Sequence, residues 1–158
     1  MGYEIERKFR VDTGRIDWRQ ATSKRRMVQG YLLNDAGRNV RIRIDEDRAY
    51  LTIKGAAEGI RRLEFEYEIP SEDARAMLAL TDGRLIEKQR FFFDVGGKRW
   101  EVDVFEGENR GLVVAEIELQ SEDEPFEMPE WATKEVTSDP RYLNARLLQE
   151  PYRTWVSG

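Results

Sequence analysis

Charged side chains alternate with apolar ones along several short segments of this chain, and their spacing is suited to binding and catalysis. In the first segment, Glu4, Glu6 and Lys8 alternate with Ile5 and Phe9. A period of two is typical of a β-strand, whose successive side chains point to opposite faces. The polar face of a half-buried strand is ordinarily mixed, whereas here it is almost wholly ionic. The sequence therefore predicts strands with one apolar face and one face of both charges.

The basic members of these faces number seven. Seven cations exceed what a single carboxylate ligand requires and match a polyanion such as a triphosphate chain, because the Arg fork binds phosphate through two hydrogen bonds and Lys supplies a point charge. We expect these residues to bind the phosphates of a small-molecule substrate: Lys8, Arg41, Arg43, Lys54, Arg62, Lys88 and Arg90.

The acidic members occur mostly in pairs two residues apart, which places neighbouring oxygens on one strand face. Carboxylate oxygens are suited to hard divalent cations such as Mg²⁺ or Mn²⁺. One such pair is more often structural than metal-binding, but a triphosphate with a divalent metal accounts for the acidic and basic sets together. The metal-site candidates are Glu4, Glu6, Glu64, Glu66, Asp103, Glu116 and Glu118.

Eight segments have the period of a strand: 3–11, 27–33, 39–45, 50–54, 62–69, 85–95, 99–105 and 112–120. Helical spacing occurs over 72–80, after Pro70 and Ser71, and over 141–150, after Asp139 and Pro140, and more weakly over 16–22. Many short strands with few helices favour an antiparallel barrel or a sandwich, so the fold class is mainly β.

The ionic faces leave two arrangements open. In a sandwich the apolar faces meet and the charges are solvated outside. In a closed barrel of about eight strands the ionic faces line the interior, and Ile42, Phe65 and Ile117 pack outward under helices or loops. Like charges close together along 62–68 would be relieved by a bound cation in the barrel arrangement.

Composition limits the function classes. The chain has 158 residues with 26 Lys plus Arg, 31 Asp plus Glu, 17 aromatic residues, and neither His nor Cys. Imidazole and thiolate chemistry is thereby excluded. From its length we expect a single domain over 1–158. We also expect a soluble, cytoplasmic protein that is a monomer or homodimer without a membrane partner. A nucleic-acid partner is not expected, because the net charge is −5 and acids interleave with bases.

Seven charged motifs follow one another along the chain: E-x-E-x-K at Glu4, Glu6 and Lys8, R-x-R at Arg41 and Arg43, T-x-K at Thr52 and Lys54, R-x-E-x-E at Arg62, Glu64 and Glu66, E-K-x-R at Glu87, Lys88 and Arg90, E-x-D at Glu101 and Asp103, and E-x-E at Glu116 and Glu118, followed by K-E-V-T and Y-x-N within 134–144. In this order and over nearly the whole chain, they resemble the motifs of the CYTH domain, or triphosphate tunnel metalloenzyme, superfamily. The resemblance implies a closed eight-stranded antiparallel tunnel with a few flanking helices. Members hydrolyse or cyclise triphosphate compounds with Mg²⁺ or Mn²⁺, and the chain is most similar to short bacterial members.

We therefore expect metal-dependent hydrolysis of inorganic tripolyphosphate, with Lys88, Glu4 and Glu6 in catalytic roles. A carboxylate, a metal-bound hydroxide or Lys88 could activate the attacking water, and phosphate binding is the favoured role of Lys88. Glu64 and Glu66 could join a second metal, orient the basic residues, or form structural ion pairs. An adenylate cyclase of the same superfamily and a polyphosphate-binding module without turnover are the alternative functions.

Two segments have no settled place in this interpretation. The segment 141–150 is expected to pack on the apolar side of the sheet, and the alternative is a plug at one tunnel mouth with Tyr142 and Asn144 near the ligand. The second strand presents Met27, Gln29 and Tyr31, which lack an obvious ionic contribution. Trp131, Tyr152 and Trp155 are expected to cover the barrel exterior.

Overall fold

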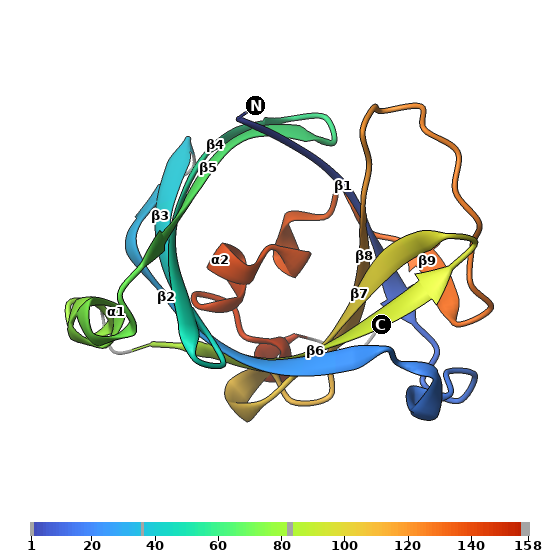
Figure 1. Ribbon diagram of the computed structural model, residues 1–158, viewed down its shortest axis with the longest axis horizontal. Coiled ribbons are helices and arrows are strands. Elements are labelled where there is room, and N and C mark those ends of the chain that lie inside the picture. The colour runs from blue at the N-terminus through green and yellow to red at the C-terminus, as the bar shows by residue number, and fades with distance from the viewer. Residues whose placement is uncertain (1, 36, 82–83, 156–158) are drawn as a thin grey trace.

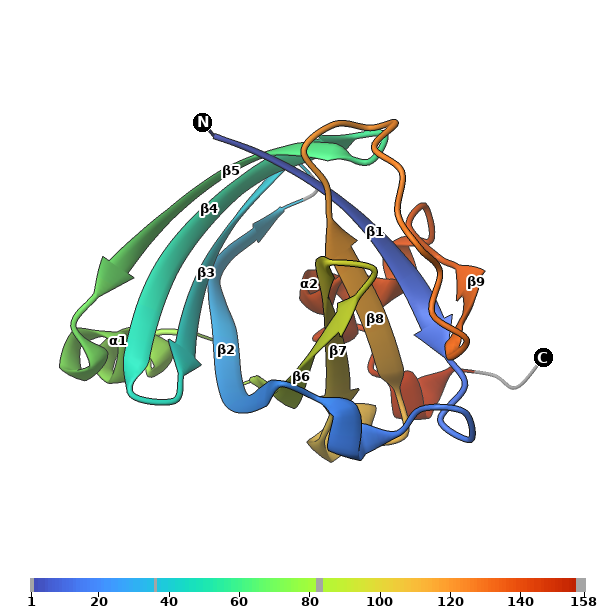
Figure 2. The same ribbon diagram turned by 45° about the vertical axis from the view of Figure 1, so that its right-hand side comes forward.

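The computed structural model describes residues 2–35, 37–81 and 84–155, and most of them form antiparallel strands (Figures 1 and 2). The strands are β1 (Tyr3–Val11), β2 (Ser23–Asp35), β3 (Arg38–Asp45), β4 (Arg48–Glu58), β5 (Arg61–Ile69), β6 (Ile86–Val95), β7 (Lys98–Phe105), β8 (Val113–Glu118) and β9 (Ala132–Glu135). The helices are α1 (Ser71–Leu78) and α2 (Asn144–Leu147), with 3₁₀ turns at Trp18–Gln20, Gly107–Asn109, Pro140–Tyr142 and Tyr152–Thr154.

Eight of the strands close into a barrel. Their order is β5-β4-β3-β2-β6-β7-β8-β1, and β1 pairs with β5 to complete the ring, which Figure 1 shows from one end. The closed eight-stranded antiparallel barrel is confirmed, and the sandwich is wrong. The unpredicted β9 pairs with the far end of β1, at Phe9↔Glu135, and lies outside the ring of eight.

Strand register brings the ionic faces side by side around the interior. β1 and β8 pair at Glu6↔Glu118 and Lys8↔Glu116, and β4 and β5 pair at Lys54↔Glu64. Because side chains alternate along each strand, fixing one such pair places every second residue of both strands on the same face. The barrel interior, called the tunnel below, therefore collects the charges of all eight strands.

An aromatic cluster covers the outside of β1, β6, β7 and β8. Phe9, Phe93, Trp100 and Trp131 pack there, with the Trp100 and Trp131 ring centroids 5.7 Å apart. Trp131 therefore lies on the barrel exterior, as expected. Burial of such large apolar surfaces is the main stabilising contribution to folding, so this half of the barrel carries the principal core.

Helix α1 covers β2, β3 and β4, where Ala74 is buried against Ile42 and Ala49. Close packing also requires Gly30 on β2, because a Cβ there would lie 3.0 Å from the Thr81 side chain. The helix predicted over 72–80 is thus confirmed, with slightly different ends. No helix among the described residues is long and apolar enough to cross a membrane.

The outer wall of β4 and β5 is not covered. Ile53, Phe65 and Tyr67 are 40%, 43% and 57% exposed. The expectation that Phe65 packs under a helix or loop is wrong, because α1 reaches this wall only at the end where Ala49 of β4 pairs with Ile69 of β5.

Two predicted helices are also wrong. Over 16–22 the chain forms only the turn Trp18–Gln20, and 141–150 divides into the turn Pro140–Tyr142 and the four-residue α2. Leu143 between them is extended, with φ −70° and ψ 133°. Barrel side chains bind the carbonyls of this segment instead: Lys8 Nζ donates to the Tyr142 oxygen and Asn34 Nδ2 to the Ala145 oxygen.

Candidate active site in the tunnel

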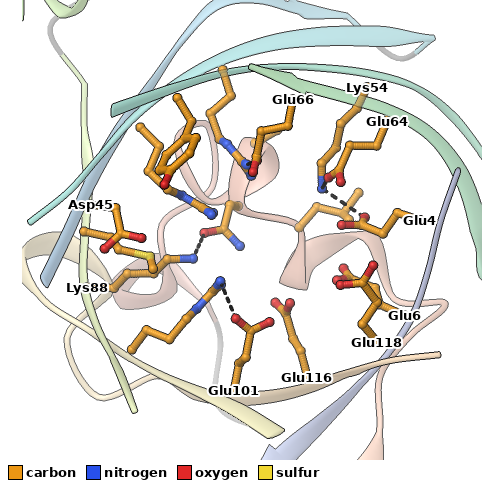
Figure 3. A pocket seen from close by; sticks show the side chains of 18 of the residues that line it. Glu4, Glu6, Asp45, Lys54, Glu64, Glu66, Lys88, Glu101, Glu116 and Glu118 are labelled. Atoms are coloured by element: carbon orange, nitrogen blue, oxygen red, sulfur yellow. Dashed lines mark hydrogen bonds and ion pairs between the residues drawn. The ribbon is translucent and has the colours of Figure 1, made fainter. Parts of the chain in front are cut away.

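The tunnel contains a charged cavity of about 270 Å³. Figure 3 shows side chains from opposite walls directed toward a common centre. The lining residues come from strands on all sides of the barrel and from the segment 143–145: Glu4, Glu6, Lys8, Arg25, Met27, Tyr31, Asn39, Arg41, Arg43, Asp45, Tyr50, Lys54, Arg62, Glu64, Glu66, Lys88, Arg90, Arg99, Glu101, Glu116, Glu118, Leu143, Asn144 and Ala145.

A buried ion-pair group holds the two basic residues of β6. Asp103 accepts from Arg90 Nε at 2.7 Å and from Lys88 Nζ at 2.8 Å. Burial opposes ionisation of Asp103, but Arg90 and Lys88 outweigh it and keep the Asp103 pKa well below its usual value. For Lys88 burial dominates, assisted by Arg90 and Arg43, and lowers its pKa to about 7 despite Asp103.

On β3, Arg41 and Arg43 lie between the charged walls. Arg41 Nη2 is 3.4 Å from Glu66 Oε2, and Thr52 Oγ1 donates to the same carboxylate oxygen at 2.9 Å. Burial, followed by repulsion from Arg41 and Arg90, lowers the pKa of Arg43 to about 10. Positive charge is therefore crowded on this side, so an anion entering the tunnel would relieve repulsion.

The carboxylates of β1 and β5 share Lys54. Its Nζ lies 3.0 Å from Glu4 Oε1 and 3.3 Å from Glu64 Oε2. Burial raises the pKa of Glu4, but Lys54 and the hydrogen bonds from Lys54 and Glu64 reverse that effect and lower it to about 2. Burial and then the charge of Glu4 raise the pKa of Glu64 to about 7.

A surplus of negative charge gathers beside this group. Figure 3 shows Glu4, Glu6, Glu116 and Glu118 on one side of the tunnel, with Lys88 on the other. Burial and then the charges of Glu116 and Glu4 raise the pKa of Glu6 well above its usual value. Such crowding fits a hard divalent cation, whose charge would allow the carboxylates to ionise together. No three carboxylates of the described residues already form a closed metal cluster, so a cation would have to draw them together.

The segment 140–147, called the plug below, enters one end of the tunnel, and Figure 1 shows α2 inside the ring of strands. Asn144 Oδ1 accepts from Lys88 Nζ at 2.8 Å and from Gln29 Nε2 at 3.1 Å. Packing of this segment on the sheet exterior, the favoured expectation, is wrong. Tyr152 and Trp155 follow the plug and pack with Tyr142.

The structure brings together all seven basic candidates and six of the seven acidic ones in the cavity wall. Asp103 is instead buried behind Lys88 and Arg90, with both carboxylate oxygens bound to them. Sequence reasoning missed Arg25 and Arg99, which line the cavity. The sequence pattern could have identified both, because Arg25 lies two residues before Met27 and Arg99 two residues before Glu101, on the same strand faces.

Comparison with known proteins agrees with this geometry. The family model described as the CYTH domain matches residues 2–151. The chain belongs to the CYTH domain family. This CYTH domain is 47% identical, over 98% of its length and 99% of the relative's, to a protein of Acetivibrio thermocellus named inorganic triphosphatase. It is 35% identical to a Nitrosomonas europaea protein of the same name, over 91% and 95% of the two chains.

Solved structures agree as well. The crystal structure of an inorganic triphosphatase is similar to this CYTH domain with a TM-score of 0.65 and 31% identity, over 98% of this chain and 97% of that one.

Proposed function

We propose that this CYTH domain hydrolyses a phosphoanhydride bond of inorganic triphosphate in the presence of a divalent cation. The observation that carries the proposal is the convergence of nine Lys and Arg side chains and eight carboxylates on one cavity of about 270 Å³, among them all seven basic candidates and six of the seven acidic ones. The names of the two relatives, at 47% and 35% identity over nearly the whole chain, support it.

Hydrolysis of a phosphoanhydride requires positioning and neutralisation of charge more than covalent chemistry from the protein. Lys8, Arg41, Arg43, Lys54, Arg62, Lys88 and Arg90 bind the phosphate oxygens. Because Arg43 is crowded by Arg41 and Arg90, a bound anion offsets the repulsion among these three cations. Charge complementarity is thus built into the site before substrate enters.

Glu4, Glu6, Glu64, Glu66, Glu116 and Glu118 are the residues that would hold Mg²⁺ or Mn²⁺. When bound, the cation supplies neutralisation of phosphate charge and a lower pKa for water. For Asp103 we propose a positioning role in place of metal binding, since its two oxygens are taken by Lys88 and Arg90. It holds those cations toward the tunnel.

Lys88 binds phosphate in this proposal. Its ammonium already donates to Asp103 and Asn144, both at 2.8 Å, which leaves one N–H for a substrate oxygen. A pKa near 7 also leaves Lys88 partly neutral at physiological pH, so activation of the attacking water remains its competing role. The ratio of rates for Lys88→Arg and Lys88→Ala separates the two, because Arg retains a phosphate ligand but is a poor base.

Substrate preference follows from the cation count. A chain of three phosphates reaches more of the seven cations than pyrophosphate does, and an organic tail adds binding only where a pocket receives it. Inorganic tripolyphosphate should therefore have a higher kcat/KM than ATP, and pyrophosphate should be a poor substrate or an inhibitor.

The test is phosphate release from tripolyphosphate, pyrophosphate, ATP and thiamine triphosphate, each with Mg²⁺ and with Mn²⁺. Preferred release from tripolyphosphate supports the proposal. Accumulation of cyclic AMP from ATP would instead assign an adenylate cyclase, and binding of tripolyphosphate without any turnover would assign a polyphosphate-binding module.

A further inference from the structure

The middle of β2 contributes three uncharged side chains to the tunnel, because Met27, Gln29 and Tyr31 face the interior. Gln29 is fully buried at its centre and lies opposite Arg43 in the β2–β3 pairing. A buried carboxamide is costly unless both its donor and its acceptor are bound. The partners of Gln29 therefore indicate its role.

Both ends of the Gln29 carboxamide are bound. Arg43 Nε donates to Gln29 Oε1 at 2.8 Å, and Gln29 Nε2 donates to Asn144 Oδ1 at 3.1 Å. Asn144 Oδ1 also accepts from Lys88 Nζ at 2.8 Å. One chain of hydrogen bonds thus joins β3, β2, the plug and β6.

The direction of this chain is fixed by Arg43. Its guanidinium can only donate, so Gln29 must present oxygen to Arg43 and nitrogen to Asn144, and Asn144 must then present its oxygen to Gln29 and to Lys88. Reversal of either amide would set donor against donor in the barrel interior.

Gln29 also differs in charge from the acceptors that hold other tunnel cations. Arg90 is bound by Asp103 and Glu101, and Lys54 by Glu4 and Glu64. No ion pair within the described part of the chain involves Arg43. A neutral acceptor restrains Arg43 through Nε without offsetting its charge, and both Nη groups stay available for a phosphate.

We propose that Gln29 is a positioning residue for the triphosphatase reaction: it holds Arg43 by a neutral acceptor and, through Asn144, aligns the plug with Lys88. The inference rests on the proposed function. It predicts that an acidic residue at this position would hold the guanidinium and yet impair binding of the anionic substrate.

The chain offers a matched control on the same strand. Asn34 Nδ2 donates to the Ala145 oxygen at 3.0 Å, so it also anchors the plug, but within the described residues its side chain makes no hydrogen bond to Arg43 or Lys88. Gln29→Met keeps the side-chain volume and removes both hydrogen bonds. Gln29→Glu keeps the acceptor for Arg43, adds a charge and removes the donor to Asn144.

The experiment measures steady-state kinetics on tripolyphosphate with Mg²⁺, calorimetric binding of tripolyphosphate in metal-depleted buffer, and thermal unfolding. Gln29→Met should lower kcat/KM about tenfold or more, the scale for losing a hydrogen bond to a charged group, and weaken metal-free binding in parallel. Asn34→Ala should change kcat/KM less than about threefold. Gln29→Glu should unfold at or above the wild-type temperature and still show a raised KM. In an Arg43→Ala background, Gln29→Met should cost much less than it does in the wild type.

Three results would overturn the inference: equal kinetic losses in Gln29→Met and Asn34→Ala, wild-type KM in Gln29→Glu, or full additivity of Gln29→Met with Arg43→Ala. Failure of the proposed function is a separate outcome. In that case the wild-type protein itself would release no phosphate from tripolyphosphate.

Discussion

Glu4 and Glu6 lie two residues apart on the same face of β1, yet their environments have opposite effects on stability. Glu4 is 3.0 Å from Lys54, and its pKa is lowered to about 2. Glu6 lies opposite Glu118 in the β1–β8 pairing, and burial together with Glu116 and Glu4 raises its pKa. We therefore predict that Glu4→Gln destabilises the metal-free protein and that Glu6→Gln stabilises it, although both variants lose activity.

The sign and size follow from proton linkage. The pKa of Glu4 falls from 4.5 in the unfolded chain to about 2, so its ionised form stabilises the fold above pH 4.5 and that contribution is lost as pH falls toward 2. At 1.36 kcal/mol per pKa unit, Glu4→Gln should cost up to about 3 kcal/mol at neutral pH. The pKa of Glu6 is raised, so its contribution is favourable below its unfolded pKa and is lost as pH rises through the folded value. Glu6→Gln should therefore gain up to about 1 kcal/mol above that value, the scale of a repulsive cross-strand pair.

The assay is urea unfolding of wild type and both variants in metal-depleted buffer, at about pH 4 and about pH 8. The advantage of Glu6→Gln should be present at the higher pH and absent at the lower one. Added Mg²⁺ should stabilise the wild type and reduce this advantage, because a ligand bound by the native state raises its stability. The reasoning fails if both variants shift stability in the same direction at the higher pH, or if Mg²⁺ stabilises Glu6→Gln as much as wild type.

Three further predictions concern the same tunnel. Asp103→Asn leaves Lys88 and Arg90 buried without their shared anion, so it should lower the free energy of unfolding, measured by urea, by about 3–5 kcal/mol. The control Glu106→Gln removes the exposed ion pair with Arg26 and should lower it by less than about 1 kcal/mol. Arg43→Ala should lower kcat/KM for tripolyphosphate by an amount equivalent to no more than a few kcal/mol of activation free energy. The substitution of an exposed arginine, Arg38→Ala, should change kcat/KM little. Chelation of divalent cations should stop phosphate release and leave the far-ultraviolet circular dichroism unchanged, because the aromatic core around Trp100 lies outside the tunnel; loss of the β-sheet signal would contradict this.

The sequence by itself determined the eight strands of the barrel and most of the charged side chains that line the tunnel. A period of two is a local property of the backbone, so Glu4, Glu6 and Lys8 had to share a face wherever β1 was placed. The same reasoning identified Arg41, Arg43, Lys88 and the other basic residues that line the cavity. The basic and acidic sets on these faces also made a triphosphate with a divalent cation the ligands to expect, because together they account for both sets.

Only the tertiary structure decided which face became the interior. A charged face can lie in solvent or in a tunnel with the same local pattern, and the choice depends on closure of the ring by β1 and β5. Closure also left Phe65 exposed, because α1 is too short to cover the β4–β5 wall. Asp103 matched the metal candidates in type and spacing, but contacts from β6 place its oxygens on Lys88 and Arg90.

The plug shows most clearly where sequence reasoning ended. Helical spacing over 141–150 describes local preference, whereas Lys8 and Asn34 bind the carbonyls of this segment from strands more than 100 residues away. Those long-range hydrogen bonds replace the helix and bring Asn144 to Lys88 and Gln29. The period-two pattern could place Gln29 on the tunnel face of β2. It could not identify the partners of Gln29 on β3 and the plug, because strand pairing and barrel closure bring them to Gln29, and not their spacing in the sequence.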